Sequence, residues 1–262
     1  YFNIEINKCI IDLNIFFIMI NKRKFYINGT WINPIIKNDF QVINPSNEQT
    51  YAFISLGSKK DVDLAVNAAK KAFITWSQVD KKEKISLLEN LLKIYKNRWD
   101  EITQTMSEEM GAPLDWSSSA QTSSGADHIN DFILRLKNFE FEKRFNKNSN
   151  NYIVYEPIGV CGLITPWNWP INQITLKVIP ALATGCTMIL KPSEIAPMSG
   201  IIFAELIHEA GFPPGVFNLI NGDGDGVGTD LSSHKDIDMM SFTGSTRAGK
   251  LISKNAADTI KR

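Results

Sequence analysis

The chain has 262 residues, of which 44% are hydrophobic and 21% are charged, so it is long and apolar enough to bury a sizeable core. Its 28 basic and 28 acidic side chains cancel, which argues against nucleic acids and anionic membrane surfaces as partners. Small molecules and further copies of the chain are therefore the expected partners.

Few residues are suited to metal binding or to disulfide formation. The three cysteines, Cys9, Cys161 and Cys186, have no metal-ligand spacing, and the three histidines are scattered along the chain. We therefore expect no metal site. The scarcity of cysteine and the lack of a recognisable processing signal favour a reducing, cytoplasmic location.

The first twenty residues differ in character from the rest of the chain. The apolar run from Cys9 to Ile20 is too short, and too interrupted by polar residues, to span a bilayer. It also lacks the cationic start and the small-residue cleavage site of a signal peptide. We interpret residues 1–20 as an extension that is not native, and Met19 as the true start.

The stretch from Lys24 to Ile54 is predicted to be extended. Short β-type runs are separated by an Asn28-Gly29 turn and an Asn44-Pro45 corner, which is the pattern of a small antiparallel lead-in.

Helices are predicted next along the chain. Ser58 and Asp61 form a capping box, after which apolar residues repeat at helical spacing from Val62 to Trp76. The same period continues in a second helix over 85–95, and a third helix is predicted over 126–136.

Two polar stretches interrupt this pattern. The charged cluster Lys81–Lys84 is interpreted as a solvated helix face. Residues 146–151 are rich in turn formers and precede a short β-type run at Tyr152–Tyr155. We place a domain boundary near Pro157.

Beyond this boundary strands and helices alternate. Strands are predicted at 160–164, 187–190, 216–220 and 239–242, and helices at 171–183, 198–210 and 248–257, with a short polar helix after the third strand. Continuous apolar strands separated by helices predict an α/β fold with a Rossmann-like parallel sheet and flanking helices. Such a sheet binds ligands at the carboxyl ends of its strands.

The most specific motif is the segment Thr165-Pro166-Trp167-Asn168-Trp169-Pro170, located where the first of these strands turns into its helix. Pro170 suits the first helical turn, where a missing N–H does no harm. Asn168 is then fixed at the strand end with its amide available to a ligand. A purely structural alternative is that Asn168 only caps the helix.

The second motif, Lys191-Pro192-Ser193-Glu194, follows the second strand. At this position a Rossmann-type sheet binds the adenosine ribose through an acidic side chain. Lys191 and Glu194 are both able to bond ribose hydroxyls, and a surface ion pair between them is the alternative.

Two glycine-rich segments follow the third and fourth strands. The first, residues 222–228, is a common kind of turn that also suits close backbone approach to a flat ligand. In the second, Gly244 and Ser245 lie at a helix N-terminus that suits a pyrophosphate. Gly244 to Lys250 also matches the frame of a P-loop nucleotidase, but Leu251 stands where magnesium needs Ser or Thr.

Four strand ends of one predicted sheet thus carry groups that suit a dinucleotide, and chance agreement among all four is far rarer than any single structural alternative. The residues therefore predict dinucleotide binding.

The second glycine-rich segment is the fourth motif, Phe242-Thr243-Gly244-Ser245-Thr246. In their order and spacing, the first, second and fourth motifs resemble the aldehyde dehydrogenase superfamily, over about Phe25 to Arg262. The resemblance implies a coenzyme-binding domain made of residues 21–140 and 158–262. It also implies a bridging strand within 141–157 that pairs between subunits of a homodimer or homotetramer. The catalytic domain of the family is absent from this chain.

The resemblance also assigns roles to residues. Asn168 would donate its amide to the oxyanion that forms when a cysteine thiolate attacks an aldehyde. NAD is the expected cofactor because the Glu194 carboxylate repels a 2′-phosphate, although NADP is accepted by some members with this motif. The implied cofactor-binding residues are Ile164, Thr165, Pro166, Trp167, Lys191, Glu194, Gly224, Gly228, Phe242, Gly244 and Ser245.

The activity implied for the full-length protein is NAD(P)+-dependent oxidation of an aldehyde to a carboxylic acid through a thiohemiacetal and a thioester. The family's catalytic cysteine and general-base glutamate lie downstream of the matched region, so this chain alone is expected to be inactive.

Cys161 and Cys186 lie in apolar strand contexts typical of buried thiols. Two rival hypotheses are a non-catalytic nucleotide-binding or interaction module and a genuine P-loop ATPase.

Overall fold

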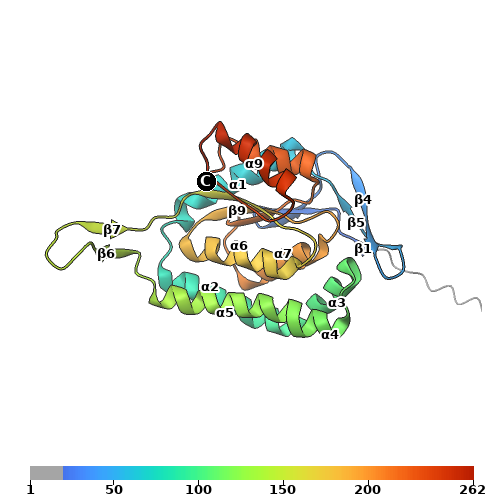
Figure 1. The fold of residues 1–262 in the computed structure, drawn as a ribbon, viewed down its shortest axis with the longest axis horizontal. Coiled ribbons are helices and arrows are strands. Elements are labelled where there is room, and N and C mark those ends of the chain that lie inside the picture. Colours follow the sequence, from blue (N-terminus) through green and yellow to red (C-terminus); the bar gives the residue numbers. More distant parts are fainter. Residues whose placement is uncertain (1–19) are drawn as a thin grey trace, which may run out of the picture.

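The computed structural model describes residues 20–262, and the interpretation of Met19 as the start lies outside that range. Within it the chain forms an α/β fold with a central mixed sheet and flanking helices (Figure 1). No helix in this range is both long and apolar enough to cross a membrane.

The elements alternate as predicted in the second half of the chain. The strands are β1 Ile20–Asn21, β2 Phe25–Ile27, β3 Thr30–Ile32, β4 Asp39–Asn44, β5 Gln49–Ser55, β6 Glu142–Arg144, β7 Tyr152–Val154, β8 Val160–Ile164, β9 Thr187–Lys191, β10 Phe217–Leu219 and β11 Met239–Phe242. The helices are α1 Lys59–Trp76, α2 Lys81–Asn97, α3 Trp99–Met110, α4 Leu114–Trp116, α5 Ser123–Asn138, α6 Pro170–Thr184, α7 Met198–Ala210, α8 Thr229–Ser233 and α9 Thr246–Ala257, with π-helical segments η1 Ser117–Thr122 and η2 Gly224–Gly228.

The central sheet has the strand order β11-β8-β9-β10-β2-β3. Its first four strands are parallel, with Cys161 opposite both Met188 and Met239. The predicted parallel sheet is therefore confirmed. β2 joins β10 antiparallel and β3 joins β2 antiparallel, so the lead-in completes one edge of the sheet.

The predicted lead-in is not a single antiparallel unit, which corrects the sequence interpretation. Its first hairpin, β2–β3, extends the central sheet, whereas β4 and β5 pair antiparallel in a second sheet in which β1 runs parallel to β5. The local sequence of a short strand does not indicate which sheet the strand joins, because strand pairing depends on partners distant in sequence.

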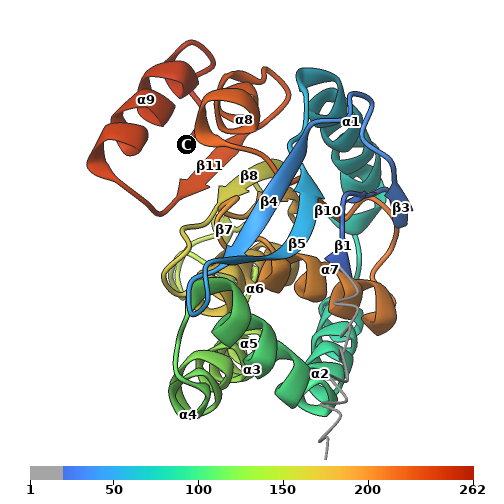
Figure 2. The same ribbon diagram turned by 90° about the vertical axis from the view of Figure 1, so that its right-hand side faces the viewer.

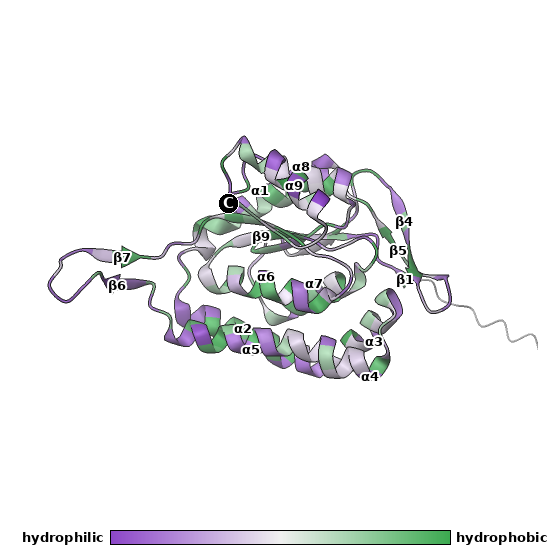
Figure 3. Cartoon of the chain, viewed as in Figure 1, coloured by the Kyte–Doolittle hydropathy of each residue, from purple (hydrophilic) through white to green (hydrophobic). Residues whose placement is uncertain are grey.

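Helices cover both faces of the central sheet. α6 and α7 pack on one face and α1 on the other, while α2 and α5 form an outer layer beyond α6 and α7 (Figures 1 and 2). In the hydropathy colouring, the central strands that lie between the helix layers are hydrophobic, whereas β6, which lies outside these layers, is hydrophilic (Figure 3). The core is therefore divided into two apolar clusters, one on each face of the sheet.

Local sequence explains why the two helices that matter most for the site begin where they do. Ser58 caps α1 through the predicted capping box, in which the Asp61 carboxylate accepts the Ser58 backbone N–H at 2.8 Å. Pro170 begins α6, as predicted. α6 therefore begins directly after the motif that ends β8.

The interpretation of Lys81–Lys84 as a solvated face is wrong for Lys84. This residue is 5% exposed, and its ammonium nitrogen lies 5.8 Å from the centroid of the Trp76 ring. Burial lowers the pKa of Lys84. The aliphatic stem of a lysine packs well against an aromatic face, and a charge pattern in the sequence does not reveal that contact.

Helix α3 was not predicted from the sequence. This helix buries Thr103, Thr105 and Glu109 together with Ile102 and Met106, so its inward face is largely polar and the apolar period is weak. The third predicted helix, 126–136, corresponds to the middle of the longer α5.

β6 and β7 form an antiparallel hairpin that projects from one end of the molecule (Figure 1). The predicted β-type run at 152–155 forms β7, and the turn-rich residues 146–151 lie at the tip of the hairpin. The exposed side chains of Tyr152 and Val154 leave β7 without a core of its own.

Candidate functional site

A cavity of about 340 Å³ opens at the carboxyl ends of β8, β9 and β11. All eleven residues predicted to bind the cofactor line it: Ile164, Thr165, Pro166, Trp167, Lys191, Glu194, Gly224, Gly228, Phe242, Gly244 and Ser245. Residues from four separate segments of sequence thus meet in one place. The location agrees with the rule that open α/β sheets bind ligands at this edge.

Asn168 lies outside this set. Its side chain is exposed, and it does not line the cavity. The alternative that Asn168 caps α6 is wrong, because Trp169 occupies the N-cap position and no side chain caps this helix. The Asn168 amide is therefore not used by the helix that follows it.

The end of β8 contributes a buried polar group to the cavity wall. The Thr165 hydroxyl is buried and has no hydrogen-bond partner among residues 20–262, although its residue lines the cavity. The Thr165 backbone N–H donates to the Lys191 carbonyl at 3.2 Å, which ties the ends of β8 and β9 together. A buried hydroxyl without a partner is unfavourable unless a ligand or water completes it.

Lys191 and Glu194 form a close pair at the end of β9. The Lys191 ammonium donates to the Glu194 carboxylate at 3.3 Å and to the Pro192 carbonyl at 3.0 Å. Lys191 is 3% exposed, and burial lowers its pKa. The two residues therefore do form the ion pair of the alternative interpretation, but it is not a surface pair, because the Lys191 cation lies inside the protein at the cavity wall.

The glycine-rich segment after β10 forms the π-helical η2. The Asp223 carboxylate caps it by accepting the Gly226 N–H at 2.7 Å. A side chain at Gly224 would meet no atom within 4 Å, so this face of η2 is open. The segment therefore borders the cavity with backbone.

The fourth motif places the start of α9 at the opposite wall. Ser245 is the N-cap of α9, and its hydroxyl accepts the Ala248 N–H at 3.3 Å. A Cβ on Gly244 would lie 2.5 Å from the Phe242 ring, so only glycine fits there without displacing that ring. Leu251 lines the cavity and Lys250 does not, which opposes the P-loop alternative.

Residues that the sequence did not assign to cofactor binding complete the lining. They are Ser193, Ile195, Asp225, Thr229, Ser232, Thr243, Arg247, Ala248, Leu251, Ile252 and Asn255. Four of them, Ala248, Leu251, Ile252 and Asn255, recur at helical spacing on α9, and this period was the signal that could have located them. Asn255 donates to the Ser232 hydroxyl at 3.0 Å and joins α9 to α8.

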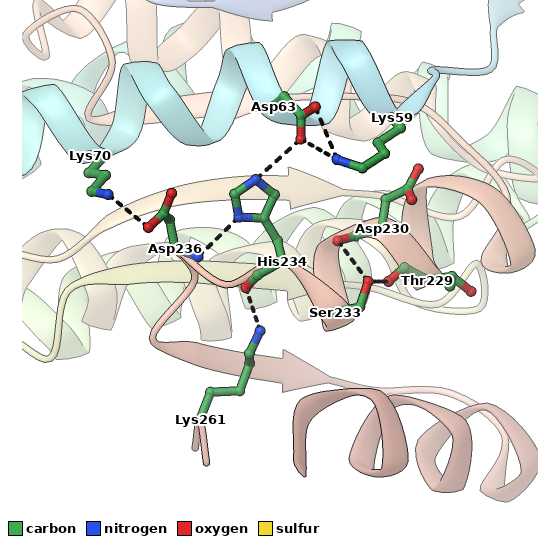
Figure 4. A network of polar contacts seen from close by, with 9 residues as sticks. All are labelled: Lys59, Asp63, Lys70, Thr229, Asp230, Ser233, His234, Asp236 and Lys261. Atoms are coloured by element: carbon green, nitrogen blue, oxygen red, sulfur yellow. Dashed lines mark hydrogen bonds and ion pairs between the residues drawn. The ribbon is translucent and has the colours of Figure 1, made fainter. Parts of the chain in front are cut away.

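A polar network behind the cavity holds α8 against α1 (Figure 4). His234 follows α8; its Nε2 lies 3.3 Å from an Asp63 carboxylate oxygen, and its Nδ1 accepts the Asp236 N–H at 3.1 Å. Lys261 donates to the His234 carbonyl at 2.6 Å. Since α8 carries Thr229 and Ser232 of the lining, this network supports one wall of the cavity.

The two described cysteines do not belong to this cavity. Cys161 and Cys186 are both buried, as predicted, and neither lines it. Within residues 20–262 no group of three His, Cys, Asp or Glu side chains is placed to hold a metal ion.

Comparisons with known proteins agree with this architecture. The 3-succinoylsemialdehyde-pyridine dehydrogenase of Pseudomonas sp is 50% identical over 241 residues, which is 92% of this chain and 50% of that protein. The chain therefore spans about half the length of this curated relative.

Two solved structures are also similar. An aldehyde dehydrogenase from Bartonella henselae superposes with a TM-score of 0.92 at 56% identity, covering 93% of this chain and 52% of that one. A variant of aldehyde dehydrogenase C from Pseudomonas syringae, complexed with NAD+ and octanal, superposes with a TM-score of 0.89 at 44% identity, covering 92% of this chain and 49% of that one.

The family model described as "Aldehyde dehydrogenase family" matches residues 31–262. That match includes all four cavity-lining segments and most of the fold. The chain belongs to the aldehyde dehydrogenase family.

Proposed function

We propose that the protein oxidises an aldehyde to a carboxylic acid with NAD+ as oxidant, and that this chain supplies the NAD+ site. The observation that carries the proposal is the convergence of the eleven motif residues on one cavity. Family membership supplies the class of reaction. Because the chain covers half of its curated relative, the activity of the whole protein is part of the proposal.

The residues of the cavity fit a dinucleotide. Glu194 and the buried Lys191 offer an acceptor and a donor for the two hydroxyls of a ribose. Leu251 and Ile252 offer an apolar surface to a base, and the Thr165 hydroxyl gains a partner when a ligand is bound. The backbone around Gly244 approaches closely enough for a pyrophosphate at the start of α9.

The chain's own residues then have distinct tasks. Glu194 accepts from the ribose and disfavours a 2′-phosphate, so NAD+ is preferred over NADP+. Asn168, whose amide is not used as a cap, donates to the oxyanion that develops from the aldehyde oxygen. Bound NAD+ supplies the hydride acceptor.

Self-association through the β6–β7 hairpin is a further part of the proposal. β7 pairs only with β6, so its other edge has free backbone donors and acceptors in the described chain. Exposed Tyr152 and Val154 flank that edge. A dimer or tetramer would cover it.

The cofactor site is tested by calorimetric titration of NAD+ and NADP+ into the protein made from its natural gene. Glu194→Gln is expected to weaken NAD+ binding about tenfold, since a charge-assisted hydrogen bond becomes a neutral one. The same change should narrow the preference for NAD+ over NADP+, because the carboxylate that repels a 2′-phosphate is removed. Glu140→Gln is the matched control, because Glu140 is exposed and lies more than fifty residues before Glu194 in the sequence. Absence of NAD+ binding by the unaltered protein would overturn the proposal.

The reaction is tested by aldehyde-dependent NADH formation, with Asn168→Ala expected to lower turnover by about 10² to 10³. NAD+ binding without NADH formation from any aldehyde would favour the non-catalytic module instead. Residues 1–262 produced alone should form no NADH, because neither described thiol lies at the cavity.

A further inference from the structure

Glu109 is a buried carboxylate far in sequence from every motif of the site. It lies near the end of α3, is 1% exposed, and does not line the cavity. Its oxygens accept the backbone N–H groups of Met198 at 2.6 Å and Ser199 at 2.9 Å, and also the Ser199 hydroxyl. A glutamate of one helix thus binds the first residues of another, α7.

These bonds replace a cap that the local sequence does not provide. The first N–H groups of a helix have no partner within the helix. Pro197 occupies the N-cap position of α7, and its side chain has no hydrogen-bonding atom. Glu109 therefore performs the capping from outside, and its negative charge suits the positive end of the helix dipole.

The start of α7 is also the end of the loop that forms one wall of the cavity. This loop, residues 192–197, leaves β9 after Lys191 and presents Ser193, Glu194 and Ile195 to the cavity. Proline at both ends restricts its backbone. With one end fixed by the sheet, the place of Glu194 depends on where the first turn of α7 is held.

A second contact keeps α3 and α7 together when the cap is removed. Arg98, directly before α3, lies 2.7 Å from the Glu205 carboxylate and 2.7 Å from the Glu209 carboxylate, both near the end of α7. The two helices are therefore joined at both ends. Loss of Glu109 alone should leave the packing of the helices in place and free only the loop end.

We propose that Glu109 is a positioning residue for the cofactor, which fixes the Ser193–Glu194 wall of the cavity by capping α7 and never touches the ligand. This inference rests on the proposed NAD+ site and assigns to it a control point on α3. The wall concerned faces the adenosine ribose, so the effect of Glu109 should be confined to that half of the dinucleotide.

The test compares ligand fragments on the protein made from its natural gene. Burial raises the pKa of Glu109 to about 7, so titrations are run at pH 8, where the carboxylate is ionised. Glu109→Ala is expected to weaken AMP and NAD+ about tenfold, because a buried charge-assisted cap is lost, and to leave nicotinamide mononucleotide unchanged. Glu109→Gln keeps one acceptor oxygen for Ser199 but turns an NH2 group toward the Met198 N–H, so it should restore only part of the affinity.

Glu108→Gln is the matched control, because Glu108 is the neighbouring residue but bonds Asn44 and Gln104, not α7. Amide hydrogen exchange without ligand should rise over residues 193–199 in Glu109→Ala and stay unchanged in Glu108→Gln. Equal losses for AMP and nicotinamide mononucleotide, or no loss with unchanged exchange, would refute the positioning role.

The same experiment separates the two proposals. If the unaltered protein binds neither NAD+ nor AMP, the proposed function fails, and the exchange data then show only whether Glu109 orders the loop. If the unaltered protein binds both and Glu109→Ala binds them equally well, the NAD+ site stands and the role of Glu109 is refuted.

Discussion

At the scale of single residues, the polar groups that matter most are charged groups that the fold buries. Glu109 binds α7, Lys191 faces Glu194 from inside the protein, and Lys84 lies against Trp76. Burying such groups is costly unless they are bonded, so each marks a place where the fold holds a charge for structural or ligand-binding reasons.

His234 gives a pH-dependent prediction at this scale. Burial is the main cause that lowers the pKa of His234, and it outweighs the opposing charges of Asp63 and Asp236. Its Nδ1 accepts the Asp236 N–H, so protonation of this nitrogen breaks that bond. A histidine with a lowered pKa contributes stability that is present above about pH 6.5 and is lost as the pH falls.

We therefore expect the free energy of unfolding to fall less between pH 7 and pH 5 in His234→Gln than in the unaltered protein. The difference between the two should be on the order of 1 kcal/mol or less, since the His234 ring is partly open to solvent. Denaturant unfolding at several pH values measures it. Lys235→Gln, the exposed neighbour, serves as control. Parallel pH profiles for His234→Gln and the unaltered protein would contradict the assignment.

At the scale of elements, a close contact between helices depends on one glycine. Gly125 on α5 faces α6 and α2: a Cβ there would lie 2.3 Å from the Ile171 side chain and 2.3 Å from the Tyr95 hydroxyl. That hydroxyl is held in place because it donates to the Thr122 carbonyl at 2.8 Å. Neither neighbour has room to move, since both are fully buried.

Gly125→Ala is accordingly expected to destabilise the fold by about 1–3 kcal/mol through overpacking, although alanine is the better helix former. Ser124→Ala on the same helix is the control and should stay within about 0.5 kcal/mol. Thermal and denaturant unfolding measure both. A stabilised Gly125→Ala variant would show that α5 is able to shift away from α6.

At the scale of the whole molecule, the β6–β7 hairpin stands apart from the rest. Tyr152 and Val154 on β7 are exposed, and Phe145 near the tip is exposed as well. Apolar side chains gathered on a projecting strand are typical of a surface that another chain covers, which supports the proposed self-association.

Replacing Tyr152 and Val154 together by Lys should therefore shift the protein toward the mass of one chain, because like charges would meet across paired β7 edges. Light scattering coupled to size-exclusion chromatography measures the mass. Asn148→Lys, in the exposed turn of the same hairpin, is the control. Since the hairpin adds nothing to the core, unfolding of the remaining fold should change little, and an unchanged mass would rule out this interface.

The sequence by itself determined those features that depend on near neighbours. The capping box at Ser58, the proline that begins α6 and the alternation of apolar strands with helices are all local patterns, and each appears where it was predicted. Parallel strands place their carboxyl ends at one edge of the sheet, so four motifs that are separated in the sequence were expected to meet there. Their residues line one cavity.

Only the tertiary structure decided which polar groups are buried and which strands pair. Lys84 and Glu109 resemble ordinary exposed charges on amphipathic helices until Trp76 and α7 are placed beside them. In the same way, β2 and β4 belong to one stretch that the sequence predicts to be extended, but they join different sheets. The physical reason is that burial and strand pairing are set by neighbours in the folded structure, whereas the starts of α1 and α6 and the strand periodicity are set within a few residues.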